Sequence, residues 1–439
     1  MRGLLVALII FGAIPFILQR PFVGLLVWSW IGYMNPHRLT YDFAYSFPWV
    51  MMIAVVTLGS LALSRESKKI PLSTTSVLLF AFLVWTGIAT VFAVEQASAW
   101  QAYEEFAKTM VMVFVTLMLV NTRERMHALV WVIAVSLGFY GIKGGIFTAL
   151  GGGVSHVVGP PGSFIADNNA MALALCMTIP LMRYLQLHAK RKSVRLGLIG
   201  AMLLTGVAVL GTYSRGGLIG LLVVGGALLL KSRRRVAILA AVVVIGAVAW
   251  HFMPPQWTER MGTLHHAGET DSAETRIQSW EFAANVAIHR PLVAGGFNDY
   301  QNTALWEAYA PAGSKERAVH SIYFRTLGEQ GFPGLILLLA LLFTSWRNCQ
   351  SVRKKTRHSP EDKWAYDLAS MLQVSVAAYV VAGAALPMPY FDLSWQLMAL
   401  TVLLKLHVMH VDEPSLGLRK IGRTAPSVRA TKTRRVLPG

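Results

Sequence analysis

Two polar side chains stand at points where an apolar run of the sequence meets a loop. Arg215 lies in the turn 212–217, beside two glycines and between two apolar runs. A guanidinium is a planar fork suited to bidentate contacts with phosphate, and glycines let the backbone approach a ligand closely. His320 opens a later apolar run, and an imidazole with an ordinary pKa of about 6.5 is the natural general base at neutral pH.

Each of these two residues also has a purely structural explanation. An arginine at the end of a membrane helix can extend its charge to the interface, and a lone histidine in such a place is more often structural than catalytic. The two glycines beside Arg215 favour the ligand-binding alternative, because they leave room for a bound group.

Three further basic residues are candidates for contacts with an anion. Arg276 and Arg290 lie in the long segment 253–318, where each is either a solvated charge or a ligand contact. Lys143 lies in the glycine-rich stretch 141–145 of an apolar run, where an ionisable group is costly and usually faces a cavity. No residue pattern predicts a metal site, because the adjacent His265 and His266 have poor geometry for sharing one ion.

The composition indicates the environment in which these residues work. Hydrophobic residues make up 54% of the 439 positions and charged residues only 14%, which excludes a soluble protein. A membrane crossing takes roughly 20 apolar helical residues. We therefore expect an all-α polytopic protein with about 12 transmembrane helices. The helical segments are predicted at 3–18, 21–34, 48–63, 73–93, 104–120, 126–150, 168–187, 195–212, 215–230, 234–252, 319–346, 364–386 and 391–409.

The net charge of +18 has a topological meaning. The basic residues form short clusters between apolar runs and make no continuous basic face, so we expect no nucleic acid partner. Under the positive-inside rule these clusters are cytoplasmic. The segments 35–47, 151–167, 212–216 and 253–318 then share the opposite face, which places Arg215 and His320 on the same side of the membrane.

The chain is predicted to have four parts. Residues 1–252 and 319–410 form the membrane helices, and 253–318 form a large loop on the outer face. Within that loop, 273–288 has helical apolar spacing and is followed by Pro291, which predicts a helix along the membrane surface. Residues 411–439 form a basic tail, expected to be disordered and to touch anionic lipid headgroups.

The order of these features resembles one known superfamily. Ser214, Arg215 and Gly216 lie between two apolar runs, and a long outer loop then ends at His320 before a glycine-rich segment. Over residues 195–350 this pattern resembles the O-antigen ligase and polymerase superfamily. The N-terminal half, especially 141–145 and 159–169, is similar to ligase-like proteins associated with exosortase systems.

The resemblance implies a metal-independent, inverting glycosyltransferase with a GT-C-like membrane fold and no cofactor. Its donor would be a glycan on undecaprenyl diphosphate at the periplasmic face of the bacterial inner membrane, and its acceptor a sugar of the lipid A core. Arg215 would contact the diphosphate, and His320 would activate or position the acceptor hydroxyl. A loop arginine would assist at the diphosphate, with Arg276 as first choice and Arg290 as second, and Lys143 as a further donor contact.

Other functions remain open at this point. An O-antigen polymerase or a protein O-oligosaccharyltransferase would use the same donor with a different acceptor. A polysaccharide or lipid transporter is the alternative without chemistry. Transporters often carry internal repeats with broken helices in matched positions, and the two halves of this sequence show no such symmetry.

Overall fold

The structure is a computed structural model that describes residues 1–231, 235–252, 254–255, 257 and 271–410. The regular elements in these residues are all helices, which confirms the predicted all-α class. The first half contains α1 (Arg2–Gln19), α2 (Pro21–Met34), η1 (Pro36–Leu39), η2 (Phe43–Tyr45), α3 (Trp49–Leu63), α4 (Thr74–Val91), α5 (Gln96–Leu119), α6 (Arg123–Leu150) and α7 (Asn168–His188). The second half contains α8 (Lys192–Gly211), α9 (Arg215–Lys231), α10 (Arg235–Phe252), α12 (Asp271–His289), η3 (Asp299–Gln301), α13 (Thr303–Tyr309), α14 (Ile322–Thr356), α15 (Lys363–Gly383) and α16 (Asp392–His410).

The chain is a multi-pass membrane protein by the length and composition of these helices. Within the described residues, seven helices are long and apolar enough to cross a membrane, namely α1, α4, α6, α7, α8, α14 and α15. The helix predicted over 273–288 in the long loop is present as α12. The predicted tail 411–439 and the His265–His266 pair lie outside the described residues.

Two helices are longer than their apolar runs predicted. Helix α5 begins at Gln96 instead of residue 104, and α14 continues to Thr356 instead of 346. The prediction followed apolar side chains alone, whereas both extensions carry charged or polar residues that favour helix, among them Arg353 and Lys354. Helix α14 is therefore longer than the apolar run that would span the hydrocarbon core of a membrane.

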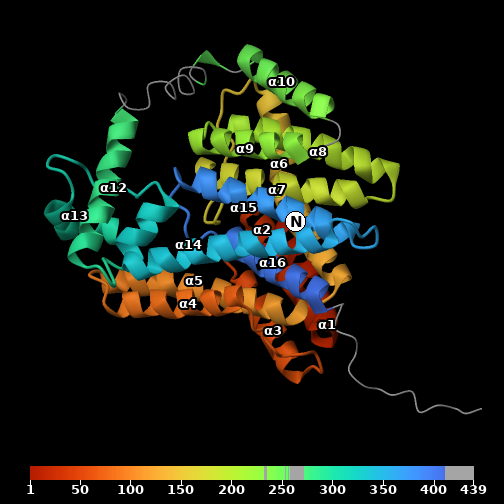
Figure 1. Cartoon of the computed structure of the whole chain (residues 1–439), viewed down its shortest axis with the longest axis horizontal. Helices are drawn as coiled ribbons and strands as arrows, with labels where there is room; N and C mark the ends of the chain where they lie inside the picture. The colour runs from red at the N-terminus through yellow and green to blue at the C-terminus, as the bar shows by residue number, and fades with distance from the viewer. Residues whose placement is uncertain (232–234, 253, 256, 258–270, 411–439) are drawn as a thin grey trace, which may run out of the picture.

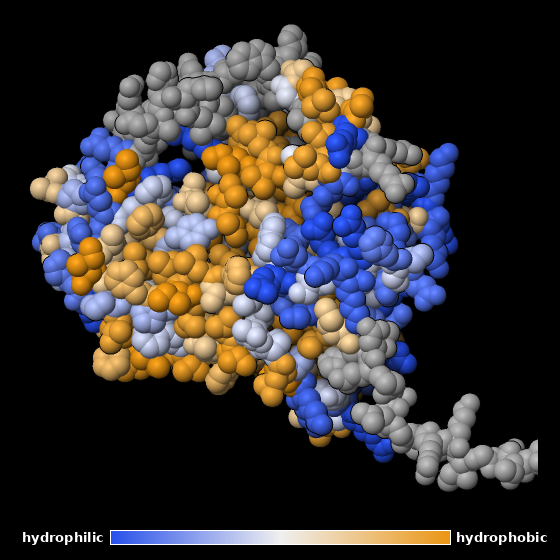
Figure 2. Space-filling view, viewed as in Figure 1, coloured by the Kyte–Doolittle hydropathy of each residue, from blue (hydrophilic) through white to orange (hydrophobic). Residues whose placement is uncertain are grey.

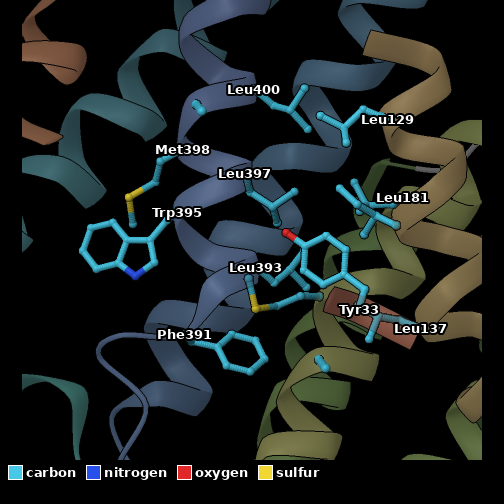
Figure 3. Packing of buried hydrophobic residues seen from close by; sticks show 14 of the residues in the cluster. Tyr33, Leu129, Leu137, Leu181, Phe391, Leu393, Trp395, Leu397, Met398 and Leu400 are labelled. Atoms are coloured by element: carbon cyan, nitrogen blue, oxygen red, sulfur yellow. The ribbon is translucent and has the colours of Figure 1, made fainter. Parts of the chain in front are cut away.

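Helix α7 forms the centre of the bundle and is almost completely enclosed by protein. Of its apolar window, 89% is buried, and it packs against α6, α8, α9 and α15. A helix that is apolar on all sides requires such an environment. On the other side of the core, Leu393 and Leu397 of α16 lie with Tyr33 of α2, Leu137 of α6 and Leu181 of α7 (Figure 3).

The bundle has two chemically different ends. At one end, Arg125 at the start of α6 pairs with Glu66 at 2.6 Å, and the connections α7–α8 and α14–α15 carry the basic clusters. At the other end, α12 runs across the bundle instead of along it, beside α13 (Figure 1). Figure 2 shows a hydrophobic band between these two ends. We call the first the basic end and the second the α12 end.

Helix α14 is kinked at Gly331, nine residues after its first residue, Ile322. Gly331 has φ 69° and ψ −173°, a conformation that glycine adopts without steric cost. Pro333 follows and has no amide hydrogen to donate to the preceding turn. The kink leaves backbone carbonyls available to other partners.

Candidate active site

His320 lies in an extended segment that leads directly into α14 at the α12 end. The next residue, Ser321, caps the helix, since its hydroxyl accepts hydrogen bonds from the amides of Tyr323 and Phe324 at 3.3 and 3.5 Å. The carbonyl of His320 accepts a hydrogen bond from Trp280 Nε1 at 3.3 Å. The cap at Ser321 and the hydrogen bond from Trp280 together fix the backbone of His320, and thereby the position from which its imidazole extends.

The imidazole of His320 is an uncharged acceptor in this environment. Burial lowers its pKa to about 4, and the positive charge of Arg276 acts in the same direction, while Asp167 acts against it. Its Nδ1 atom is buried and has no hydrogen-bond partner within the described residues. At neutral pH the ring is therefore neutral and able to accept a proton, although it is a weaker base than an exposed histidine.

Arg276 is brought to His320 by the packing of α12 on α14. Trp280 stacks on Phe324, with ring centroids 5.1 Å apart and planes 7° apart. Arg276 precedes Trp280 by one helical turn, so both side chains lie on the same face of α12. Because Trp280 also contacts the carbonyl of His320, this face is turned toward the histidine. The effect of the Arg276 charge on the pKa of His320 agrees with that placement.

The turn that carries Arg215 is bound to the start of α7. Asn168 Nδ2 donates to the carbonyl of Thr212 at 2.8 Å, and the hydroxyl of Ser214 donates to Asn169 Oδ1 at 2.8 Å. Arg215 is the first residue of α9, so its side chain emerges at a helix N-terminus. Backbone amides at such a terminus and the guanidinium together favour a bound anion.

Asp167 connects the Arg215 turn with His320. It caps α7 by accepting hydrogen bonds from the amides of Asn169 and Ala170 at 2.7 and 3.1 Å. Its negative charge raises the pKa of His320, which places the two side chains within electrostatic reach. The segment that holds the Arg215 turn is therefore also the segment beside the histidine.

The end of α15 packs against both helices that carry these residues. A Cβ on Gly216, next to Arg215, would lie only 2.9 Å from Leu386. At Gly383 a Cβ would lie 2.8 Å from Ile322, the first residue of α14. The starts of α9 and α14 therefore both pack against the end of α15 and the residues just after it. Arg215 and His320 consequently lie at the same end of the bundle.

The other two predicted residues are not brought to this place. Arg290 follows α12 at its opposite end, where its Nη2 donates to the carbonyl of Phe92 at 2.7 Å. Since Arg276 and Arg290 are 14 residues apart, a helix separates them by about 21 Å. Lys143 is exposed on α6, whereas Gly141 and Gly145 beside it face α8.

A buried polar cluster lies one turn into α14 that the sequence analysis did not assign. Arg325 Nε donates to Glu329 Oε1 at 2.9 Å, and the side chain of Glu329 is fully buried. The only sequence signal was an arginine and a glutamate four residues apart in an otherwise apolar run, a spacing that pairs side chains on one helix face. Its partners come from the outer loop and from the segment after α15, and the sequence does not reveal them.

Two segments of the chain match family models. Residues 200–339 match the model described as O-Antigen ligase, and this range contains the Arg215 turn, α12 and His320. Residues 200–339 therefore carry a domain of the O-antigen ligase family, which supports a place for this protein in the O-antigen ligase superfamily. Residues 1–190 match a model described as Family of unknown function (DUF5935), so the likeness of this half to exosortase-associated ligases stays a prediction. No curated protein matches the chain.

The match to the O-antigen ligase model indicates the general activity. Members of the matched family are glycosyltransferase-like ligases, and the match therefore supports glycosyl transfer of the ligase or polymerase type in general. The matched segment ends within α14 just after the Gly331–Pro333 kink, and it therefore includes the buried Arg325–Glu329 pair as well as the two residues singled out first.

Proposed function

We propose that this protein transfers a glycan from undecaprenyl diphosphate to a hydroxyl of a lipid A core sugar, at the periplasmic face of the bacterial inner membrane. The observation that supports this most is that the Arg215 turn lies at the same end of the bundle as an uncharged His320, opposite the basic clusters, with Arg276 within electrostatic reach of the histidine. Two guanidiniums suit a diphosphate, and a neutral imidazole suits a hydroxyl.

The arginines act on the leaving group. When the bond between the anomeric carbon and the phosphate oxygen breaks, the electron pair stays on the diphosphate, whose negative charge grows. Arg215 at the N-terminus of α9, assisted by Arg276 from α12, is placed to stabilise that charge in a water-poor site. In this proposal Arg290 and Lys143 bind no phosphate, because Arg290 binds a backbone carbonyl and Lys143 lies on the outside of α6.

His320 acts on the acceptor. The hydroxyl oxygen attacks the anomeric carbon on the side opposite the diphosphate, so the configuration inverts, and the hydroxyl proton passes to the imidazole. A pKa of about 4 means that this proton moves only once the new bond is well formed. A bound diphosphate would offset the charge of Arg276, which is one of the groups that lower the pKa of His320.

Purified full-length protein in nanodiscs tests this proposal. Carrier-linked glycan is supplied with three separate acceptors: lipid A core, a second carrier-linked glycan and a serine-containing protein. Transfer to lipid A core alone is expected. Transfer to the carrier-linked glycan or to the protein would instead assign a polymerase or a protein O-oligosaccharyltransferase, and donor movement across the bilayer without transfer would assign a transporter.

The role of His320 is tested in the same assay. His320→Ala is expected to lower kcat by about 10²–10⁴, the usual contribution of a general base. Lys315→Ala removes an exposed charge from the same outer segment and serves as the control, with activity expected near that of the wild type. Full transfer by His320→Ala would contradict the assigned role.

A further inference from the structure

The segment after α12 is bound into the kink of α14 through the backbone. The amide of Gly295 donates to the carbonyl of Gly328 at 2.9 Å, and the amide of Gly296 donates to the carbonyl of Glu329 at 3.0 Å. In a regular helix the carbonyl of Glu329 would bind the amide of residue 333, which is a proline and has none. The outer loop therefore replaces helix hydrogen bonds that the kink removes.

Side chains reinforce this docking at the same place. Arg325 donates from Nε to Glu329 Oε1 at 2.9 Å, from Nη2 to Asn298 Oδ1 at 3.2 Å and from Nη1 to the carbonyl of Pro387 at 2.8 Å. The amide of Asn298 donates to Glu329 Oε1 at 3.0 Å. One guanidinium thus joins α14, the outer loop and the segment between α15 and α16.

A second carboxyl group lies beside this pair without hydrogen bonds. Asp299 is 1% exposed, and within the described residues neither of its carboxyl oxygens has a hydrogen-bond partner. Burial and the charge of Glu329 raise the pKa of Asp299 well above its ordinary value. Arg325 is already neutralised by Glu329, so an ionised Asp299 would leave one buried negative charge without compensation.

We propose that Arg325, Glu329 and Asp299 form a proton-binding centre that positions the active site. Glu329 is the carboxylate that pairs with Arg325, and Asp299 carries the bound proton as a neutral acid. The centre keeps the outer loop docked on the kink of α14, and so keeps Arg276 of α12 facing His320. The second part rests on the function proposed above.

The link from the centre to the active site runs through α12. Its first half is held by the stack of Trp280 on Phe324, directly before Arg325. Its end is held by the docked segment that includes Gly295 and Asn298. Helix α12 is therefore attached to α14 on both sides of the centre, and loss of the second attachment frees Arg276 to move relative to His320. A misplacement of about 1 Å in such a site can cost about 100-fold in rate.

The surroundings of Asp299 determine the direction of the pH effect. The charged or titratable groups there are Arg325 and Glu329 from α14, Tyr300 beside Asp299, and Tyr390 from the segment before α16. Helix α12 contributes only the apolar side chain of Ala283 at this place, among the residues that the structure describes. A raised pKa means that docking is favoured while Asp299 holds its proton. Docking is weakened as the pH rises toward and through that pKa, because a second buried negative charge appears.

Hydrogen exchange of the full-length protein in nanodiscs tests the centre without relying on activity. The amides of residues 291–301 are expected to be protected in the wild type. Glu329→Gln removes the charge that neutralises Arg325, so these amides should exchange at least about 10-fold faster. Asp299→Asn keeps the shape of a neutral acid, so protection should be retained and should no longer decrease at alkaline pH. Glu307→Gln on the exposed face of α13 is the matched control.

Infrared spectroscopy tests directly whether the carboxyl group of Asp299 is protonated. The carbonyl band of a protonated carboxylic acid is expected in the wild type and should disappear in Asp299→Asn. In the transfer assay Glu329→Gln should lower kcat by about 100-fold, with a smaller change in the donor KM.

Two results would overturn the proposal: wild-type exchange in Glu329→Gln, or equally fast exchange in Asp299→Asn, which would show that Asp299 is ionised. Should Glu329→Gln fail to fold, the pH dependence of exchange and of the acid band in the wild type decides the matter. If no protein transfers glycan while exchange and infrared data agree with the centre, the proposed function fails and the centre stands.

Discussion

Helix α14 carries arginines at both of its ends, and the two ends differ in what those arginines do. At the basic end Arg347 is exposed and lies over the ring of Phe343 on its own helix. At the α12 end Arg325 is mostly buried and binds Glu329 on its own helix and two other segments of chain. An exposed arginine such as Arg347 indicates the orientation of the helix in the membrane. A buried arginine such as Arg325 holds segments of chain together.

The largest difference between the two ends is expected in the effect on kcat of replacing Arg215 or Arg347. Arg215→Ala should lower kcat by about 10²–10³, because a charge-stabilising donor is lost where negative charge develops. Arg215→Lys should recover only part of this, since an ammonium lacks the planar fork. Arg347→Ala should leave transfer near the wild-type rate. A transfer assay with the lipid-linked donor measures all three, and equal losses at both ends would remove the distinction.

A comparison of Arg325 with Arg347 tests the structural side. Arg325→Met leaves the carboxylate of Glu329 buried without its cation and should cost about 3–5 kcal/mol of unfolding free energy. Arg347→Met changes an exposed side chain and should cost within about 0.5 kcal/mol. Thermal unfolding in the same detergent gives both values, and a small loss for Arg325→Met would show that its contacts contribute little.

The attachment of α12 is tested through Trp280. Trp280→Ala removes the stack on Phe324 and the hydrogen bond to the carbonyl of His320. An aromatic pair contributes about 0.5–1.5 kcal/mol beyond the area that it buries, and the upper end of this range corresponds to roughly a tenfold effect on docking. We expect kcat of Trp280→Ala to fall about 10-fold, whereas Trp280→Phe should retain most of the wild-type kcat. An unchanged rate in Trp280→Ala would mean that α12 does not position Arg276.

The smallest effect is expected from mild acidification. Because the pKa of His320 is lowered to about 4, the ring stays neutral from pH 7 down to about pH 5, and transfer should be nearly flat there. Below that range the imidazole gains a proton and transfer should fall as the pH passes through about 4. Stability should fall in the same direction, since an unfolded histidine with a pKa of about 6.5 binds protons more readily than the buried one. A fall in kcat centred near pH 6.5 would contradict this environment.

The helices could be predicted from the sequence because each follows from a local pattern. Apolar runs located the bundle, and the spacing 273–288 located α12. Capping contacts such as that of Asp167 also lie within a few residues of the chain. These features need no knowledge of distant partners.

The site could be predicted only in part, because its contacts join distant segments. Arg215 and His320 were proposed from their places at the ends of apolar runs, whereas the choice between Arg276 and Arg290 depends on which face of α12 meets α14. The buried pair Arg325–Glu329 was overlooked because Asn298 and Pro387, which bind Arg325, are remote in sequence. Lys143 was expected to face a cavity because of its apolar neighbours, but neighbours in sequence do not show which side of α6 is exposed.

The central claim is that the α12 end binds a lipid diphosphate through Arg215, and an experimental structure with undecaprenyl diphosphate bound tests it most directly. The account predicts a phosphate oxygen within hydrogen-bond distance of the Arg215 guanidinium, with Arg276 nearby and His320 facing the space beyond the phosphate. A diphosphate bound at the basic end, or one at the α12 end with Arg215 turned away from it, would contradict the account.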